Sequence, residues 1–276
     1  MNGRGAASVL GISIDALTMP ELLAELREDL KRGKRQWVAT VNNEMLVQAD
    51  RDRKYHALLA SADRRIADSA GVVWAAYHAR VGGGYVRAFG QLVRMAINPA
   101  GVRGELPGTI PGSDLSVELA GMCEEFGYRM QLVGSGPGVA AAAASELRTR
   151  FPKLQVNATE GGRGTAAEDS TIRATIGQAD VILVAYGPPK QDLWISRNLS
   201  KLSKPVVVVG VGGTLDYLAG GRPVNGGRPA SMPPAWIRHR GFEWAWRLVT
   251  QPRRLKRIIT AVPVFVGRVV RYDADR

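Results

Sequence analysis

VILVAYGPPKQD, at residues 181–192, is the stretch that decides the fold of this chain. Its first six residues are apolar and partly β-branched, and a small, polar break precedes them. Such a run predicts a strand buried on both faces, as in a parallel sheet. Gly187-Pro188-Pro189 then ends the strand, and Lys190-Gln191-Asp192 begins a segment with helical spacing. Open α/β sheets build ligand sites from this pattern, although an ordinary strand-to-helix turn explains it equally well.

Strands and helices alternate on both sides of this stretch. Further strands are expected at residues 8–14, 36–39, 64–67, 128–133, 154–158 and 205–210. Helices are expected near 18–30, 43–50, 55–60, 72–77, 85–97, 113–126, 139–150 and 171–176. Thr18 and Glu21 have the spacing of a capping box, and Asn43 is expected to cap the next helix. The order predicts an α/β fold: one Rossmann-like, mostly parallel sheet with helices on both faces, over residues 1–220.

Residues 221–276 differ in composition and charge. They hold eleven Arg and one Lys against three acidic residues, a net +9 of the whole chain's +12. A Gly/Pro linker is expected to about residue 234, followed by two helices separated near Pro252. This basic α-helical C-terminal appendage would attract phosphates, nucleic acid or anionic lipid. Its aromatic residues fit either a membrane surface or packing against the main domain.

Length and composition limit the class of protein. The chain has 276 residues, of which 45% are hydrophobic and 22% charged, so it is globular. A single Cys excludes a disulfide framework and a cysteine-based zinc site, and the three His lack metal-ligand spacing. Neither a secretory signal nor a transmembrane helix is recognisable. We therefore expect a cytoplasmic protein without a structural metal.

Five predicted strands end in small or polar residues, at 40–42, 68–71, 134–138, 187–191 and 210–213. In a parallel sheet these turns gather along one edge. Asp68 is the only carboxylate at such a predicted strand end, which suits a general base or, alternatively, a helix N-cap. Thr40 and Asn42 have the same two interpretations, binding or capping. The glycine turn at 134–138 lacks the dinucleotide fingerprint but suits a phosphate, or simply tight packing.

Two basic segments have a second interpretation each. Arg247, Arg254 and Arg257 share one face if their helix is continuous, and arginines bind diphosphate bidentately. A solvated basic face is the alternative for these three residues. The amphipathic segment 85–97 is either a second membrane contact or ordinary packing.

Together the segments resemble the bacterial WecG/TagA/CpsF glycosyltransferases, which transfer a sugar from a UDP donor to a lipid-diphosphate-linked acceptor. The matching segments run in family order along most of the chain: LGISIDALT, TVNNEMLVQADRD from Thr40, ADSAG around Asp68, GSDL from Gly112, LVGSGPGVA, YGPPKQDLWI, VGVGGTLDYLAG and GFEWAWRLVTQPRRLKR. One departure is Asp68-Ser69, where the family has Asp-Gly, so this turn must accept a side chain.

The resemblance implies a role for each matching residue. Asp68 would be the general base, and Thr40 would be a second catalytic residue. The donor and its diphosphate would be bound by Asn42, Gly134, Gly136, Gly187, Gln191, Gly212, Gly213, Asp114, Arg247, Arg254 and Arg257. Residues 1–220 would hold the UDP-sugar, and the appendage would meet the anionic membrane surface.

The resemblance also implies the reaction. It would be an inverting, metal-independent transfer without a cofactor, at the inner face of the plasma membrane, in envelope or exopolysaccharide synthesis. The donor sugar would be N-acetylmannosamine, its uronic acid or glucose, and the acceptor a polyprenyl-diphosphate-linked saccharide. No nucleic-acid partner is expected, and a homo-oligomer is left open. The alternatives are a nicotinamide-dependent oxidoreductase on the same sheet and a nucleic-acid-binding module that uses the basic tail.

Overall fold

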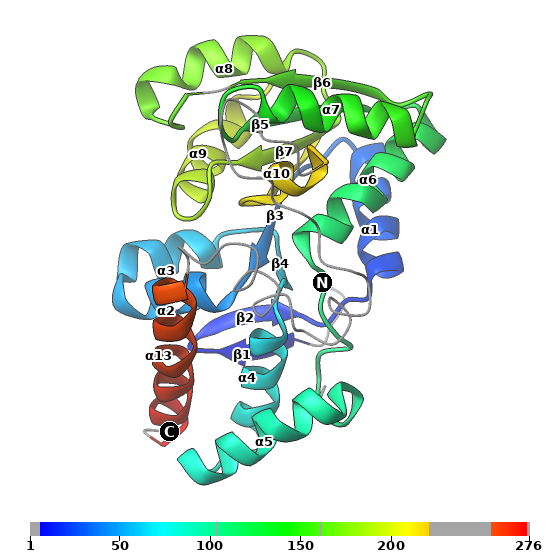
Figure 1. Cartoon of the computed structure of the whole chain (residues 1–276). Coiled ribbons are helices and arrows are strands. Elements are labelled where there is room, and N and C mark those ends of the chain that lie inside the picture. The colour runs from blue at the N-terminus through cyan, green and yellow to red at the C-terminus, as the bar shows by residue number, and fades with distance from the viewer. Residues whose placement is uncertain (1–5, 103, 161, 221–254, 275–276) are drawn as a thin grey trace.

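The computed structural model describes residues 6–102, 104–160, 162–220 and 255–274. Six strands form one sheet in the order β4-β3-β8-β7-β5-β6, and every pairing within it is parallel (Figure 1). The strands are β3 (Arg35–Val41), β4 (Arg64–Ala67), β5 (Arg129–Gly134), β6 (Gln155–Thr159), β7 (Val181–Ala185) and β8 (Val206–Gly210). The predicted α/β class is confirmed, and the central strands are buried on both faces.

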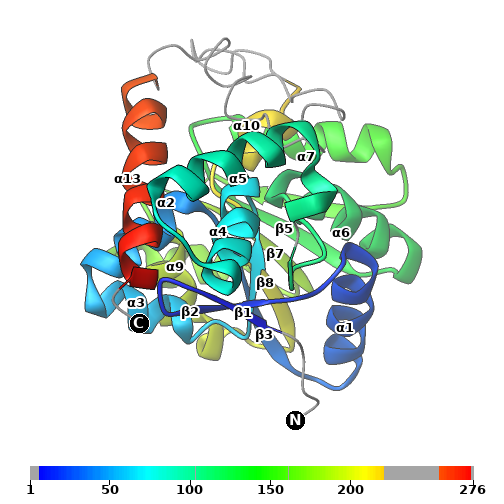
Figure 2. The ribbon, with the colours of Figure 1, turned by 90° about the horizontal axis from the view of Figure 1, so that it is seen from below.

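Helices cover both faces of this sheet. They are α1 (Met19–Lys31), α2 (Asn43–Arg51), α3 (Arg53–Ala60), α4 (Ala70–Val81), α5 (Tyr85–Ile97), α6 (Gly112–Phe126), α7 (Val139–Arg150), α8 (Asp169–Ile176), α9 (Lys190–Asn198), α10 (Thr214–Leu218) and α13 (Leu255–Ala274). Because side chains alternate between the two faces of a strand, Val38, Leu183 and Val207 pack in one core with α1 and α6, whereas Trp37, Ile182 and Val208 pack in another with α2 and α9. Figure 2 shows α1 and α6 on one side of the strands and α3 and α9 on the other.

The first predicted strand is in fact a hairpin. β1 (Ala6–Val9) and β2 (Ile12–Asp15) pair antiparallel and form a separate two-stranded sheet. Leu10 and Gly11 join them, with φ of 48° and 78°. Two successive residues at positive φ make the kind of tight turn that joins hairpin strands. The expectation of a single strand at 8–14 within one sheet was therefore wrong.

The helix caps were predicted with mixed success. The Thr18–Glu21 capping box is confirmed, with the Thr18 backbone N–H donating to Glu21 Oε2 at 2.8 Å. Asn43 does not cap α2; Asn42 does, because it is extended and its Oδ1 accepts from the N–H groups of Glu44 and Met45. Asn43 is already the first helical residue.

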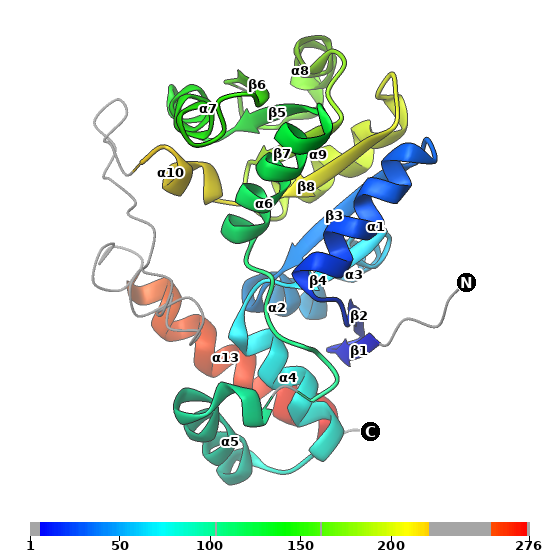
Figure 3. The same cartoon turned by 90° about the vertical axis from the view of Figure 1, so that its right-hand side faces the viewer.

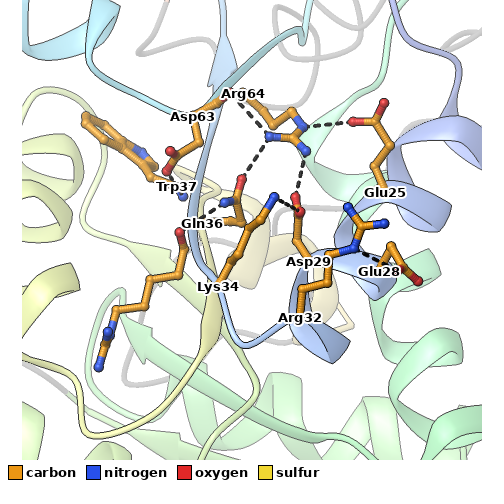
Figure 4. A network of polar contacts seen from close by, with 10 residues as sticks. Glu25, Glu28, Asp29, Arg32, Lys34, Gln36, Trp37, Asp63 and Arg64 are labelled. Carbon is orange, nitrogen blue, oxygen red and sulfur yellow. Dashed lines mark hydrogen bonds and ion pairs between the residues drawn. The ribbon is translucent and has the colours of Figure 1, made fainter. Parts of the chain in front are cut away.

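A buried polar network ties α1 to the amino-terminal edge of the sheet (Figure 4). The Arg64 guanidinium donates to Asp29 Oδ2 at 2.7 Å, to Glu25 Oε2 at 3.0 Å and to Gln36 Oε1 at 2.8 Å. Lys34 Nζ contacts the other oxygen of Asp29 at 2.8 Å. Arg64 begins β4 and Gln36 lies near the start of β3, so this network lies at the edge opposite to the strand ends considered below.

The last helix, α13, packs against α2, α4 and α5 (Figures 1 and 3). Phe265, Val269 and Val270 are buried in the same core as Trp74 of α4, and Arg268 forms an ion pair with Asp50 of α2. The Gly/Pro linker, the first appendage helix and the break near Pro252 lie outside the described residues. The division at residue 220 stays a prediction.

Candidate active site

The carboxyl ends of the parallel strands lie along one edge of the sheet, and hydrogen bonds connect their turns. The Asp68 N–H donates to Val41 O at 2.9 Å, and the Val211 N–H donates to Val184 O at 2.9 Å. The Ser135 N–H donates to Ala185 O at 3.1 Å. The predicted gathering of these turns is confirmed. The chain runs from β5 to its neighbour β6 at the edge of the sheet, and from β7 to its neighbour β8 in the opposite direction. The boundary between β5 and β7 is therefore a topological switch point, the place at which open sheets bind ligands.

Asp68 lies directly after β4 and is half-buried. Its Oδ1 accepts a hydrogen bond from the Gly112 N–H, at the start of α6, at 2.6 Å. The next helix, α4, has Ser69 as its N-cap instead. Asp68 therefore contacts a helix distant in sequence, and the partial positive charge of that helix end favours a carboxylate.

The Asp68-Ser69 departure from the family pattern is accommodated by the backbone. Ser69 is extended, with φ of −129°, a conformation that any residue adopts. Its hydroxyl donates to Asn43 Oδ1 at 2.9 Å. A Cβ on Gly71 would lie 2.4 Å from the Asn43 amide, so glycine lets α4 approach this pair.

Two threonines and Asp68 surround Gly112. A Cβ at that glycine would lie 3.5 Å from Asp68 Oδ1, 3.6 Å from Thr214 Oγ1 and 3.6 Å from Thr40 Cγ2. Thr40 is buried, and its hydroxyl donates to Gly210 O at 2.7 Å. Sequence reasoning found Thr40 but missed Thr214 and Gly112 as neighbours of Asp68. Their positions, directly after Gly212-Gly213 and at the start of GSDL, were the available signals.

Gln191 joins two of the turns. It is buried at the start of α9, and its Oε1 accepts from the Gly212 N–H at 2.8 Å. A Cβ on Gly210 would lie 2.7 Å from its Nε2, so the amide packs against the end of β8. Gln191 thus fixes the loop after β8 relative to the turn after β7. That it lines a donor pocket stays a prediction.

The glycines of the predicted turns divide into two kinds. Gly134 has φ of 97°, and a Cβ there would lie 3.0 Å from the Tyr186 ring, so this glycine permits close packing. A Cβ on Gly136 would meet only Val139, at 3.7 Å. One on Gly187 or Gly212 would meet no described atom within 4 Å. Gly187 and Gly212 have φ of 72° and 56°, so their backbone conformation favours glycine. That these turns bind a ligand stays a prediction.

Asp192, which sequence reasoning did not select, is fully buried beside Gln191. Burial raises the pKa of its carboxyl to about 6, and a hydrogen bond from the Tyr55 hydroxyl, at 2.7 Å, opposes that rise. Its Oδ1 has no hydrogen-bond partner among the described residues. Asp192 holds α9 to α3 and is a structural neighbour of the candidate site.

Five predicted site residues remain: Asp114, Asn42 and the three arginines of the C-terminal appendage. Asp114 is half-buried in the first turn of α6, the helix whose N-terminus meets Asp68. The Asn42 oxygen caps α2, which confirms the capping interpretation and leaves the binding one a prediction. Arg257 belongs to the first turn of α13, and Arg247 and Arg254 lie outside the described residues.

Glu160 follows β6 directly, so Asp68 is not the only carboxylate after a strand; β6 ends one residue later than predicted.

Within the described ranges, no cluster of three or more His, Cys, Asp or Glu is placed to hold a metal ion. No helix in the same ranges is both long and apolar enough to span a bilayer.

Comparisons with known proteins identify the family. The family model described as Glycosyl transferase WecG/TagA/CpsF matches residues 7–84 and 82–276. The chain is also similar to the N-acetylglucosaminyldiphosphoundecaprenol N-acetyl-beta-D-mannosaminyltransferase of Bacillus subtilis (strain 168). The two are 26% identical over 242 residues, which cover 87% of this chain and 80% of the relative. Because the family model covers almost the whole sequence, this protein belongs to the WecG/TagA/CpsF family of glycosyltransferases.

Proposed function

We propose that this glycosyltransferase moves a sugar from a UDP donor to a saccharide carried on a polyprenyl diphosphate, in envelope or exopolysaccharide synthesis. The name of the Bacillus subtilis relative describes transfer of an N-acetylmannosaminyl group and supports that sugar over its uronic acid or glucose. Family membership supports sugar transfer over the nicotinamide-dependent and nucleic-acid-binding alternatives.

The observation that carries the proposal is the place of Asp68. Its carboxylate lies at the carboxyl edge of the sheet, on the N-terminus of α6 and beside the two threonines that surround Gly112. As the acceptor hydroxyl oxygen attacks the anomeric carbon, the bond from that carbon to the UDP oxygen breaks. Asp68 accepts the hydroxyl proton. Attack from the face opposite to UDP inverts the anomeric configuration.

The departing UDP carries negative charge that the protein must stabilise. The turns at Gly136 and Gly187 flank the β5/β7 switch point, where open sheets bind ligands, which supports them as the site of the diphosphate. Arg247, Arg254 and Arg257 would supply guanidinium groups, so that no metal ion is required. Because the acceptor carries a lipid, the protein acts at the cytoplasmic face of the membrane, against anionic headgroups.

Asp68→Asn tests the general base. Asparagine still offers an oxygen to the Gly112 N–H but takes no proton, so kcat should fall about 10²–10⁴-fold. The rise in Tm caused by UDP should be unchanged. Glu160→Gln is the matched control, because this exposed carboxylate also follows a strand, and its kcat should equal that of the wild type.

Full activity of Asp68→Asn would remove Asp68 from the mechanism. If UDP does not raise the Tm of the wild type, the proposed donor is wrong. A Tm shift with NADH, or steeply salt-dependent binding of DNA, would favour one of the alternatives instead.

A further inference from the structure

Helix α5 carries two apolar faces, and described residues of the chain pack against one of them. Ala88 and Met95 are buried against the rest of the molecule. A second set of side chains is exposed, by fractions of 54%, 89%, 70%, 44% and 81%: Tyr85, Val86, Phe89, Val93 and Ile97. At about 100° per residue these five positions lie within an arc of about 120° on one side of the helix. Soluble proteins rarely leave such a continuous apolar strip unpartnered.

The charged residues of α5 are all basic. α5 contains Arg87 and Arg94 and has no acidic residue. At about 100° per residue, both arginines lie beside the apolar arc, between it and the packed face. The combination of an exposed apolar arc with flanking arginines matches the interface of an anionic bilayer, where apolar side chains enter the acyl boundary and guanidinium groups meet phosphates.

Helix α13 lies next to Tyr85, at one end of the strip. The two helices contact each other, and a Cβ on Gly267 would lie 3.9 Å from the Tyr85 hydroxyl. In Figure 1 both helices lie in the lower part of the molecule, away from β6, and Figure 2 shows α5 on the near side when that end faces the viewer.

A second copy of the chain fits this surface less well. In a dimer whose two-fold axis passes through this strip, each α5 would face the other α5, so the four arginines would approach one another without an acidic residue of either helix to pair with them. An anionic membrane supplies the missing negative charge.

We infer that the exposed face of α5 is a membrane-docking surface that inserts into the interface of an anionic bilayer. The inference rests on the proposed function in one respect: a lipid-linked acceptor would explain why the protein docks on a membrane. Its test measures no sugar transfer. The outcome for UDP binding and the outcome for docking are therefore separable.

A single-cysteine fluorescence experiment on the full chain tests this surface. Cys123 is buried, and burial raises its pKa to about 12, so it stays unlabelled in the folded protein. Val86→Cys receives an environment-sensitive thiol dye, and Leu193→Cys, on α9 and 44% exposed, is the matched control. Vesicles of phosphatidylcholine with about 30% phosphatidylglycerol should shift the emission at position 86 to the blue and leave position 193 unchanged.

Substitutions then separate the apolar and the electrostatic contributions. The triple variant Val86→Ser, Phe89→Ser, Ile97→Ser should lower the vesicle partition coefficient by about tenfold or more. The double variant Arg87→Gln, Arg94→Gln should lower it roughly tenfold on anionic vesicles and little on neutral ones.

Three outcomes would overturn the inference. The first is an unchanged emission at position 86, and the second is an equal shift at both positions. The third is a dye at position 86 that is shielded before vesicles are added, which would mean that a second copy or another part of the chain covers α5.

Discussion

Replacing Asp192 by asparagine should change how the stability of this protein depends on pH. The carboxyl is fully buried at the start of α9, and burial raises its pKa from the ordinary 3.8 to about 6. The folded protein therefore holds this proton more tightly than the unfolded chain does. The stability that the neutral carboxyl supplies is fully present below about pH 4 and is lost as the pH rises through 6.

The magnitude follows from the two pKa values. A rise from 3.8 to about 6 corresponds to about 3 kcal/mol, of which about 2 kcal/mol is lost between about pH 4.5 and about pH 7.5. Asparagine is neutral at every pH and still offers an oxygen to the Tyr55 hydroxyl. Asp192→Asn should therefore gain about 2 kcal/mol relative to the wild type between these two pH values.

Urea unfolding followed by tryptophan fluorescence at both pH values measures this difference, and the chain contains six Trp. Tyr55→Phe serves as the complement, because it removes the hydrogen bond to the ionised carboxylate. It should cost about 1.5–3 kcal/mol near pH 7.5 and less near pH 4.5. If Asp192→Asn differs from the wild type by the same free energy at both pH values, the carboxyl does not titrate as its burial requires.

Two further predictions concern stability alone. Arg64→Ala should lower the free energy of unfolding by about 3–5 kcal/mol, because the buried Asp29 then keeps only the half-exposed Lys34 as its cation. Arg32→Ala, in an exposed ion pair, should change it by less than about 0.5 kcal/mol. Similar values in urea unfolding would contradict the role assigned to the network in Figure 4. Gly71→Ala should cost about 1–3 kcal/mol because its Cβ overlaps the Asn43 amide. Gly90→Ala, whose Cβ meets no described atom within 4 Å, should be neutral or add up to about 1 kcal/mol. A Gly71→Ala protein as stable as the wild type would show that Asn43 moves aside freely.

The sequence determined the elements and their class. The apolar runs at β7 and β8 and the helical spacing of α5 and α7 predicted these elements to within a residue, since periodicity and turn residues are local properties of the chain. Alternation of strands and helices then predicted a parallel sheet, and with it the gathering of turns along one edge. The hairpin was missed because the positive φ of Leu10 has no signal in an apolar residue.

The tertiary structure decided which groups meet. Whether Asp68 caps α4 or contacts α6 depends on the approach of residues distant in the chain, and the loop before α6 brings Gly112 to it. The raised pKa of Asp192 and the exposed face of α5 likewise depend on burial, which no local pattern specifies. Hydrophobic spacing shows that a face is apolar, but only the packed molecule shows whether another element covers it, because burial is set by the whole chain.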